Sequence, residues 1–320
     1  AEEAFEAVGA NVFADAGVLA AVSEPVREVG SGRLLGAGDL VELYREHGHD
    51  LPARLAGSFA LAVIDRERQR LLLAVDRTGN RPLYLVRTGD AIAFSSRLGA
   101  LRRIPRLRLE IPHQALFDYL YLQMVPSPGS VYAGVEKLLP AQSLSFSAAG
   151  REARFYWQMP YQDGNPASVE DLRGELQTLL PRVVERAAAD RPAVGAFLNG
   201  GMDSAAVAGT LGQLRGQAIP TYSIGFAAQG YDEMEYARIA ARHFHTRSNE
   251  YFVTPEDLVE TVPALAAYGD EPCAGVSMVP VYLGARFARF DGADCLLAGD
   301  GGDELFGGKE RYAAQAVFEH

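Results

Sequence analysis

The sequence is poor in lysine, in cysteine and in long apolar runs. Among its 320 residues Lys137 and Lys309 are the two lysines, and the other 28 of the 30 basic residues are arginine. The 41 acidic residues bring the formal net charge to −11, which argues against nucleic acid or a membrane surface as a partner. Two cysteines, Cys273 and Cys295, exclude a disulfide scaffold and a four-cysteine zinc site.

No apolar run reaches the roughly 18 residues that span a bilayer. The first residues, Ala1-Glu2-Glu3, lack the basic region of a signal peptide. These absences predict a cytoplasmic protein. At roughly 100–200 residues per domain, the length predicts two domains.

The first half of the chain is rich in patterns typical of β-strands. Four apolar runs of strand length follow one another, with turn residues between them, at residues 59–64, 71–75, 82–86 and 91–94. A helical pattern precedes them at residues 40–47. Short strands in succession predict an antiparallel sheet or sandwich.

In the second half, patterns typical of buried strands and of helices alternate after a linker at residues 159–168. The expected strands are residues 193–198, 221–226 and 294–298. The expected helices are residues 169–189, 204–214, 232–244 and one that begins at Thr254-Pro255. This alternation predicts a parallel sheet with helices on both faces, and the two domains are expected at residues 1–158 and 169–320.

The segment Asn199-Gly200-Gly201-Met202-Asp203-Ser204 follows one of these strands and opens a helix. Its two glycines let the backbone approach an anion, and the start of a helix offers unpaired N–H donors. Asn199 and Ser204 add side-chain donors. Asp203 would repel a phosphate unless a cation lay between them, so we interpret it as a magnesium ligand. The alternative is an ordinary turn between a strand and a helix.

A second loop, residues 298–308, holds three carboxylates and five glycines in eleven residues. A tight cluster of acids needs a cation or a raised pKa. Both loops leave the carboxyl ends of strands, where open parallel sheets place their ligands. The alternative interpretation is an acidic, solvated loop.

Together the two loops resemble those of the asparagine synthetase family. The first is similar to its pyrophosphate-binding loop, usually Ser-Gly-Gly-x-Asp-Ser, and the second to its Gly-x-Gly-x-Asp-Glu-Leu-Phe-Gly-Gly segment. Residues 55–60 and 76–84 are similar to the family's glutaminase domain. The resemblance implies an α+β sandwich of the N-terminal nucleophile type, followed by an α/β domain with a parallel sheet. That second domain would be an ATP-pyrophosphatase of the adenine nucleotide alpha-hydrolase type.

The resemblance also implies an activity, in which the protein adenylates a carboxylate with ATP and ammonia or an amine then displaces AMP. By this resemblance, the pyrophosphate is expected at Asn199, Gly200, Gly201 and Ser204. The adenosine is expected at Leu198, Ile224 and Gly299. Magnesium is expected at Asp203 and Asp303. Asp300 stands where the family has a glutamate, or a tyrosine in its β-lactam-forming members, and is expected to orient or deprotonate the amine. Glu233, Asp270 and Glu271 are expected at the acceptor side or, equally, in a helix cap or surface ion pairs.

Several positions depart from the family's pattern. Its Asn-Gly-Glu triplet, which holds glutamine, would fall near residues 20–25, and these read Ala-Ala-Val-Ser-Glu-Pro. Its Ser-Asp-x-Glu element would fall near residues 35–38, which contain no acid, and residue 1 is alanine where the processed family chain begins with cysteine. We therefore expect a glutaminase domain without activity, as in members that make β-lactams or lasso peptides.

The family also continues beyond Tyr312, with helices that close the site and a lysine that stabilises developing negative charge. Neither Lys137 nor Lys309 fits that position, so we expect the second domain to be truncated at its C-terminus. Cys295, within an expected strand, is interpreted as a buried packing residue.

Three functions remain open at this point. The first is an ATP-dependent amide-forming ligase that takes a small-molecule or peptide carboxylate and ammonia or an amine, with ATP and Mg²⁺, in a chain compatible with a homodimer. The second is a non-catalytic nucleotide-binding relative that serves as a scaffold or partner subunit. The third, a tRNA thiolation enzyme of the same superfamily, is disfavoured by the acidic charge and the positions of the cysteines.

Overall fold

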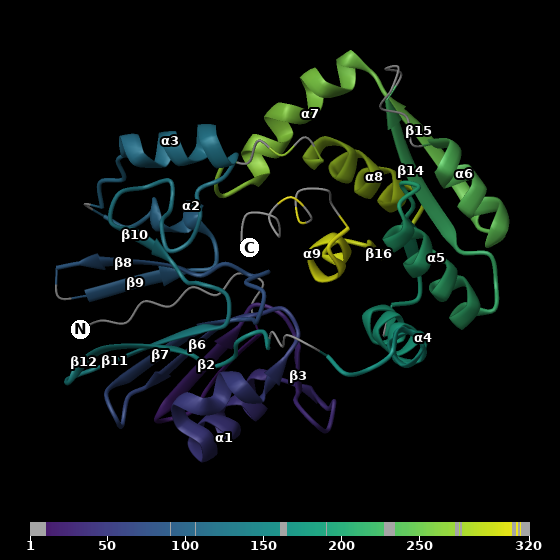
Figure 1. Cartoon of the computed structure of the whole chain (residues 1–320). Helices are drawn as coiled ribbons and strands as arrows, with labels where there is room; N and C mark the ends of the chain where they lie inside the picture. The colour runs from purple at the N-terminus through teal and green to yellow at the C-terminus, as the bar shows by residue number, and fades with distance from the viewer. Residues whose placement is uncertain are drawn as a thin grey trace. The chain divides into compact units, whose positions relative to one another are not determined.

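The computed structural model describes residues 11–89, 91–105, 107–160, 165–189, 191–226, 234–272, 275, 277–308, 312 and 314. The chain divides into two compact units, which are described separately below (Figure 1). Unit 1 comprises Ala1–Gln162 and Gly269–Ala274, and unit 2 comprises Asp163–Tyr268 and Gly275–His320. The break at 162/163 falls in the expected linker, whereas the grouping of residues 269–274 with unit 1 has no counterpart in the sequence patterns.

Unit 1 contains a six-stranded antiparallel sheet in the order β1-β2-β6-β7-β11-β12. Its strands are β1 (Asn11–Ala14), β2 (Val18–Val22), β6 (Ala60–Asp65), β7 (Arg70–Val75), β11 (Gln142–Ser147) and β12 (Gly150–Phe155). The hairpin expected from residues 59–75 is β6 and β7, with Ala62 opposite Leu73. Two three-stranded sheets accompany it, formed by β10 (Val135–Lys137), β8 (Tyr84–Thr88) and β9 (Ala91–Ser95), and by β4 (Leu34–Leu35), β3 (Val26–Glu28) and β5 (Leu55–Ala56).

Alternation of side chains along the strands gives unit 1 its layers. On one face of the six-stranded sheet, Leu61 and Val63 belong to a core that includes Leu40 and Tyr44 of helix α1 (Ala37–His47). On the other face, Leu73 and its neighbours share a core with residues of β8, so two sheets pack face to face. Helix α2 (Leu98–Leu101) covers the far side of β8. The result confirms the expected α+β sandwich.

The remaining elements of unit 1 are the 3-10 helix η1 (Gly48–Arg54) and helix α3 (His113–Leu122). Among the described residues of the whole chain, no helix is both long enough and apolar enough to cross a membrane.

Unit 2 is an α/β fold around a parallel sheet in the order β15-β14-β13-β16 (Figure 1). The strands are β13 (Val194–Phe197), β14 (Pro220–Phe226), β15 (Arg247–Val253) and β16 (Cys295–Leu297). The helices are α4 (Val169–Ala188), α5 (Met202–Arg215), α6 (Met234–His243), α7 (Pro255–Tyr268), α8 (Met278–Phe290) and α9 (Gly302–Phe306). This confirms the expected parallel sheet, and β15, α8 and α9 are additions to the elements expected from the sequence.

Helices cover both faces of this sheet. Ala196 and Leu198 share a core with residues of α4, α5 and α6. Phe197 points the opposite way, against Gly284 of α8, where a Cβ would collide with its ring. Cys295 packs against the core that contains Ala196 and Leu198. Its side chain is half-buried, whereas the sequence predicted a buried one.

Candidate active site

The two glycine loops are neighbours because the strands that precede them are neighbours. Strand β13 pairs in parallel with β16, with Ala196 opposite Leu297. Residues 198–201, where the first loop begins, join β13 to α5, and residues 298–301, where the second loop begins, join β16 to α9. Both therefore emerge at the carboxyl edge of the sheet, where parallel sheets place their ligands.

Glycine at two positions of the second loop allows the loops to touch. A Cβ on Gly299 would lie 2.7 Å from the backbone N of Ser204 and 2.8 Å from the carbonyl carbon of Asp203. A Cβ on Gly302 would collide with the carboxylate of Asp203. Real Cβ atoms do not approach other atoms so closely, so a side chain at position 299 would force the loops apart, and one at position 302 would displace the carboxylate of Asp203.

Two further glycines adopt backbone conformations that side chains disfavour. Gly200 has φ +86° and Gly301 has φ +92°. These values allow each loop to turn sharply between its strand and its helix. The glycines that the sequence places in these loops are thus used for close approach and for turning.

Asn199 organises the first loop through its side-chain oxygen. Its Oδ1 accepts a hydrogen bond from the hydroxyl of Ser204 (2.5 Å) and another from the N–H of Gly201 (3.2 Å). The Ser204 hydroxyl also lies 3.0 Å from the carbonyl oxygen of Gly201. Two donors of this loop, the N–H of Gly201 and the hydroxyl of Ser204, therefore already have an acceptor within the chain.

The acidic residues of the two loops differ in their surroundings. Asp203 is half-buried at the start of α5, and its carboxylate has no hydrogen-bond or ion-pair partner among the residues described. Asp303 is also half-buried, whereas Asp300 is exposed. In the described part of the chain, no three His, Cys, Asp or Glu side chains converge as a metal cluster. A half-buried carboxylate without a partner is nevertheless a suitable ligand for a cation that also binds phosphate oxygens.

The three residues expected at adenosine lie at or near the same edge. Leu198 is fully buried, its N–H donates to the carbonyl of Tyr222 (2.9 Å), and its carbonyl accepts from the Ser223 hydroxyl (2.6 Å). Leu198 therefore exposes no atom for a ligand in this structure. Ile224 is half-buried, two residues beyond the Tyr222 that pairs with Phe197. Gly299, also half-buried, is the contact residue of the second loop.

Asp270 and Glu271 group with unit 1 and are held there by cations. Arg97 Nε lies 2.8 Å from Asp270, and Lys137 Nζ lies 2.6 Å from Glu271. Tyr84 also donates to Glu271, at 3.1 Å. These contacts favour the ion-pair interpretation of the two acids over a place at the acceptor side. Neither Lys137 nor Tyr84 was expected from the sequence as a partner of Glu271.

Three residues that the sequence analysis considered lie outside the described residues. They are Glu233, Cys273 and Lys309.

In unit 1, other contacts occupy the position where the family's Asn-Gly-Glu triplet would fall. The Ser23 hydroxyl accepts from the N–H of Ala60 (2.9 Å), next to β6. Glu24 forms an ion pair with Arg81 at 2.8 Å. Both side chains are thus engaged within the chain.

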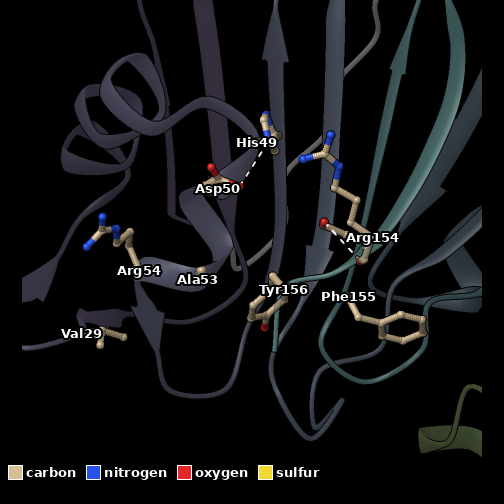
Figure 2. Close-up of a pocket in the computed structure, with 9 residues that line it drawn as sticks. Val29, His49, Asp50, Ala53, Arg54, Arg154, Phe155 and Tyr156 are labelled. Atoms are coloured by element: carbon tan, nitrogen blue, oxygen red, sulfur yellow. Dashed lines mark hydrogen bonds and ion pairs between the residues drawn. The ribbon is translucent and has the colours of Figure 1, made fainter. Parts of the chain in front are cut away.

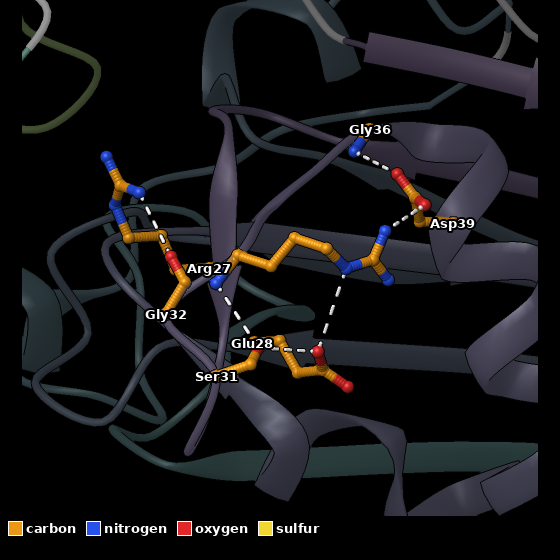
Figure 3. A network of polar contacts seen from close by, with 7 residues as sticks. Arg27, Glu28, Ser31, Gly32, Gly36 and Asp39 are labelled. Carbon is orange, nitrogen blue, oxygen red and sulfur yellow. Dashed lines mark hydrogen bonds and ion pairs between the residues drawn. The ribbon is translucent and has the colours of Figure 1, made fainter.

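The family's Ser-Asp-x-Glu element would fall near residues 35–38, and this position lies in a network of polar side chains at the surface, at the start of α1 (Figure 3). Asp39 accepts from the N–H of Gly36 at 2.8 Å and pairs with Arg33 at 2.7 Å. The backbone hydrogen bond from Gly36 and the Arg33 guanidinium hold the pKa of Asp39 below its usual value. Glu28 joins the network through Ser31, at 2.6 Å, and through Arg33. Asp39, which follows this position, therefore caps a helix.

A cavity with a volume of about 600 Å³ lies in unit 1 (Figure 2). Its lining comprises Val29, His49, Asp50, Ala53, Arg54, Ser143, Arg154, Phe155 and Tyr156. His49 and Asp50 lie 3.2 Å apart and are both largely exposed. None of the residues expected from the sequence to bind ATP or metal lines this cavity.

Comparison with known proteins agrees with both units. A family model described as asparagine synthase matches residues 175–320, and one described as glutamine amidotransferase domain matches residues 37–157. The chain belongs to the asparagine synthetase family. Within this family, a protein of Methanocaldococcus jannaschii that carries the name "Putative asparagine synthetase" is 33% identical over 276 residues, which cover 84% of this chain and 53% of that protein.

Two relatives of Bacillus subtilis agree with this assignment to the asparagine synthetase family. Asparagine synthetase 1 is 28% identical over 85% of this chain and 43% of its own length. Asparagine synthetase 3 is 27% identical over 84% of this chain and 46% of its own length. The chain thus spans about half the length of the curated relatives it matches.

Proposed function

We propose that this asparagine synthetase family member is an ATP-dependent ligase that joins a carboxylate to ammonia or an amine and releases AMP and pyrophosphate. The observation that carries the proposal is the contact between the two loops, in which Gly299 lies against the backbone of Asp203 and Ser204. Hydrogen-bond donors that can bind an anion, and carboxylates that can bind a cation, thereby lie at the same edge of a parallel sheet. The names of the relatives and the matched family model support the same reaction class.

The proposed reaction has two steps. A carboxylate oxygen of the substrate attacks the α-phosphorus of ATP, and pyrophosphate leaves. Ammonia or an amine then attacks the carbonyl carbon of the acyl adenylate, AMP leaves with that carboxylate oxygen, and the nitrogen loses a proton. The start of α5, with Gly200, Gly201 and Ser204, would hold the pyrophosphate as it departs, because backbone N–H groups at a helix start favour anions.

Three acids have proposed roles in this reaction. Asp203 and Asp303 would hold Mg²⁺, which neutralises phosphate charge and so favours attack on the α-phosphorus. The half-buried carboxylate of Asp203, which has no partner among the residues that the structure describes, fits a cation bound between protein and phosphate. Asp300 is exposed at the same edge, where its carboxylate would orient the amine or accept its proton.

We also propose that unit 1 does not hydrolyse glutamine. The residues at the positions of the family's Asn-Gly-Glu triplet are used otherwise, since Ser23 binds the backbone of Ala60 and Glu24 pairs with Arg81. The nucleophile would then be free ammonia or an amine substrate. Release of glutamate from glutamine at the rate of amide formation would contradict this proposal.

A second candidate function is a nucleotide-binding relative without catalysis. The observation that favours it is that Asn199 already accepts from two donors of the loop, the N–H of Gly201 and the hydroxyl of Ser204. This candidate predicts that ATP binds without turnover.

One experiment separates the two functions. The protein is incubated with ATP, magnesium chloride, ammonium chloride and candidate acids, beginning with aspartate, and pyrophosphate and AMP are both measured. Acid-dependent release of both products supports the ligase. ATP binding by calorimetry, without pyrophosphate release for any acid, supports the non-catalytic relative.

A further inference from the structure

The side-chain oxygen of Asn199 is turned into the first loop, where it accepts two hydrogen bonds. Its two donors are the hydroxyl of Ser204, at 2.5 Å, and the N–H of Gly201, at 3.2 Å. The N–H of Gly201 can only donate, so the Asn199 atom that faces it must be the oxygen. The amide group therefore presents its acceptor to the loop, and its NH₂ group does not replace the serine hydroxyl that the family usually has here.

We propose that Asn199 is an internal competitor for the pyrophosphate group. In this closed state its Oδ1 accepts the hydrogen bonds that an incoming anion would accept, and the anion binds only after the Asn199 side chain has turned away. The inference rests on the proposed function, because it concerns the same loop. It assigns to Asn199 a role opposite to that of an anion-binding donor.

The chemistry of the side chain distinguishes asparagine from the serine that the family usually has here. A serine hydroxyl can also accept from the N–H two residues ahead, as Ser95 does from Arg97. The Oδ1 of Asn199 accepts from that N–H and also from the hydroxyl of Ser204. A serine hydroxyl carries a proton that an anion can accept, whereas Oδ1 of asparagine carries none.

The competitor can be displaced because the residue that carries it is exposed. Asn199 is exposed, whereas Ser204 is only 4% exposed. The amide of Asn199 can therefore turn into water, which satisfies its polar atoms, while the buried Ser204 hydroxyl stays in place for the next acceptor. When Asn199 leaves, the carbonyl of Gly201, at 3.0 Å, remains an alternative partner for that hydroxyl.

The test compares Asn199→Ala with the wild-type protein. Calorimetric titration with inorganic pyrophosphate in magnesium chloride measures the affinity directly. Loss of two neutral hydrogen bonds from the competing state predicts an affinity about tenfold higher in Asn199→Ala. If Asn199 were instead a donor to the anion, the same variant would bind more weakly.

Asn165→Ala is the matched control. Asn165 makes the same type of turn, since its Oδ1 accepts from the N–H of Ala167 two residues ahead, at 3.0 Å, but it lies in an exposed segment before α4. We expect this variant to bind pyrophosphate as the wild-type protein does.

Hydrogen exchange provides a readout that needs no ligand. The amide of Gly201 should be protected in the wild-type protein and in Asn165→Ala, and should exchange about tenfold faster in Asn199→Ala. A freely exchanging Gly201 amide in the wild-type protein would overturn the inference. Equal or weaker pyrophosphate binding by Asn199→Ala would also overturn it while leaving the proposed function intact. No pyrophosphate binding by any of the three proteins would overturn the proposed site and the inference together.

Discussion

Lys137 Nζ lies 2.6 Å from Glu271 Oε2, although 134 residues separate the two in sequence. The two side chains are only 11% and 13% exposed. Glu271 also accepts from the hydroxyl of Tyr84 and from the N–H of Val131, each at 3.1 Å. Burial, followed by the charge of Glu271, raises the pKa of Tyr84 above its ordinary value, so its hydroxyl stays a donor. The carboxylate therefore has three donors in a largely dry environment.

Replacing Lys137 with methionine should destabilise unit 1. The change leaves a mostly buried carboxylate without its cation, which typically costs about 3–5 kcal/mol in the free energy of unfolding. Urea denaturation measures this free energy. Arg151→Met is the control, since Arg151 pairs with Glu136 at the surface, and the loss of such a pair costs at most about 1 kcal/mol. If both variants lose the same free energy of unfolding, the buried pair of Lys137 and Glu271 contributes no more to stability than the surface pair of Arg151 and Glu136.

Replacing Gly299 with alanine should separate the two loops. The new Cβ would start 2.7 Å from the backbone N of Ser204, so the backbone must shift. We expect at least a tenfold loss of ATP affinity and a destabilisation of about 1–3 kcal/mol, as for other overpacked positions. Gly212→Ala is the control, because a Cβ there, within α5, has nothing within 4 Å. Unchanged ATP binding by Gly299→Ala would mean that the loop contact is unnecessary.

Asp203→Asn should reduce the dependence of ATP binding on magnesium. The variant keeps the size of the side chain but removes the half-buried charge that would bind the cation. Titration of ATP at several magnesium concentrations should show a clear gain in affinity for the wild-type protein and a much smaller gain for the variant. Asp294→Asn, at an exposed aspartate of the same unit, should behave as the wild-type protein does. The same magnesium dependence in all three proteins would remove Asp203 as a ligand.

Tyr44 should make the protein less stable in alkali. Burial, with the nearby charge of Asp65, raises the pKa of Tyr44 to about 12, above its ordinary value near 10. Its contribution to stability is complete below the unfolded pKa and is lost as the pH rises from about 10 to about 12, because the unfolded state releases the proton first. Tyr44→Phe should flatten this decline by up to about 1.4 kcal/mol per pH unit. An identical decline in the variant would show that Tyr44 does not titrate in this range.

The sequence predicted the elements whose signals are local. Strand β13, helix α5 and the loop between them could be expected because an apolar run, two glycines and a helix start follow one another between Val194 and Met202. Strand β15 could not, because residues 247–253 mix charged and apolar side chains at the edge of the sheet, where only part of the strand is buried.

The contacts of Glu271 and Asn199 could not be predicted, for different reasons. Glu271 takes its partners from residues 134 and 187 positions away, and no sequence period links such distant positions. Asn199 could be recognised as a departure from the family, but an amide can donate or accept, and only the placement of Gly201 and Ser204 shows which atom faces the loop.

The most direct test of the proposed ligase follows the oxygen of the substrate. The protein is incubated with ATP, magnesium chloride, ammonium chloride and an acid substrate labelled with ¹⁸O in its carboxylate, and the nucleotide product is analysed by mass spectrometry. Adenylation predicts AMP that carries one ¹⁸O atom, because the carboxylate oxygen that attacks the α-phosphorus leaves with AMP. Unlabelled AMP, or ADP with labelled phosphate, would contradict the proposed reaction.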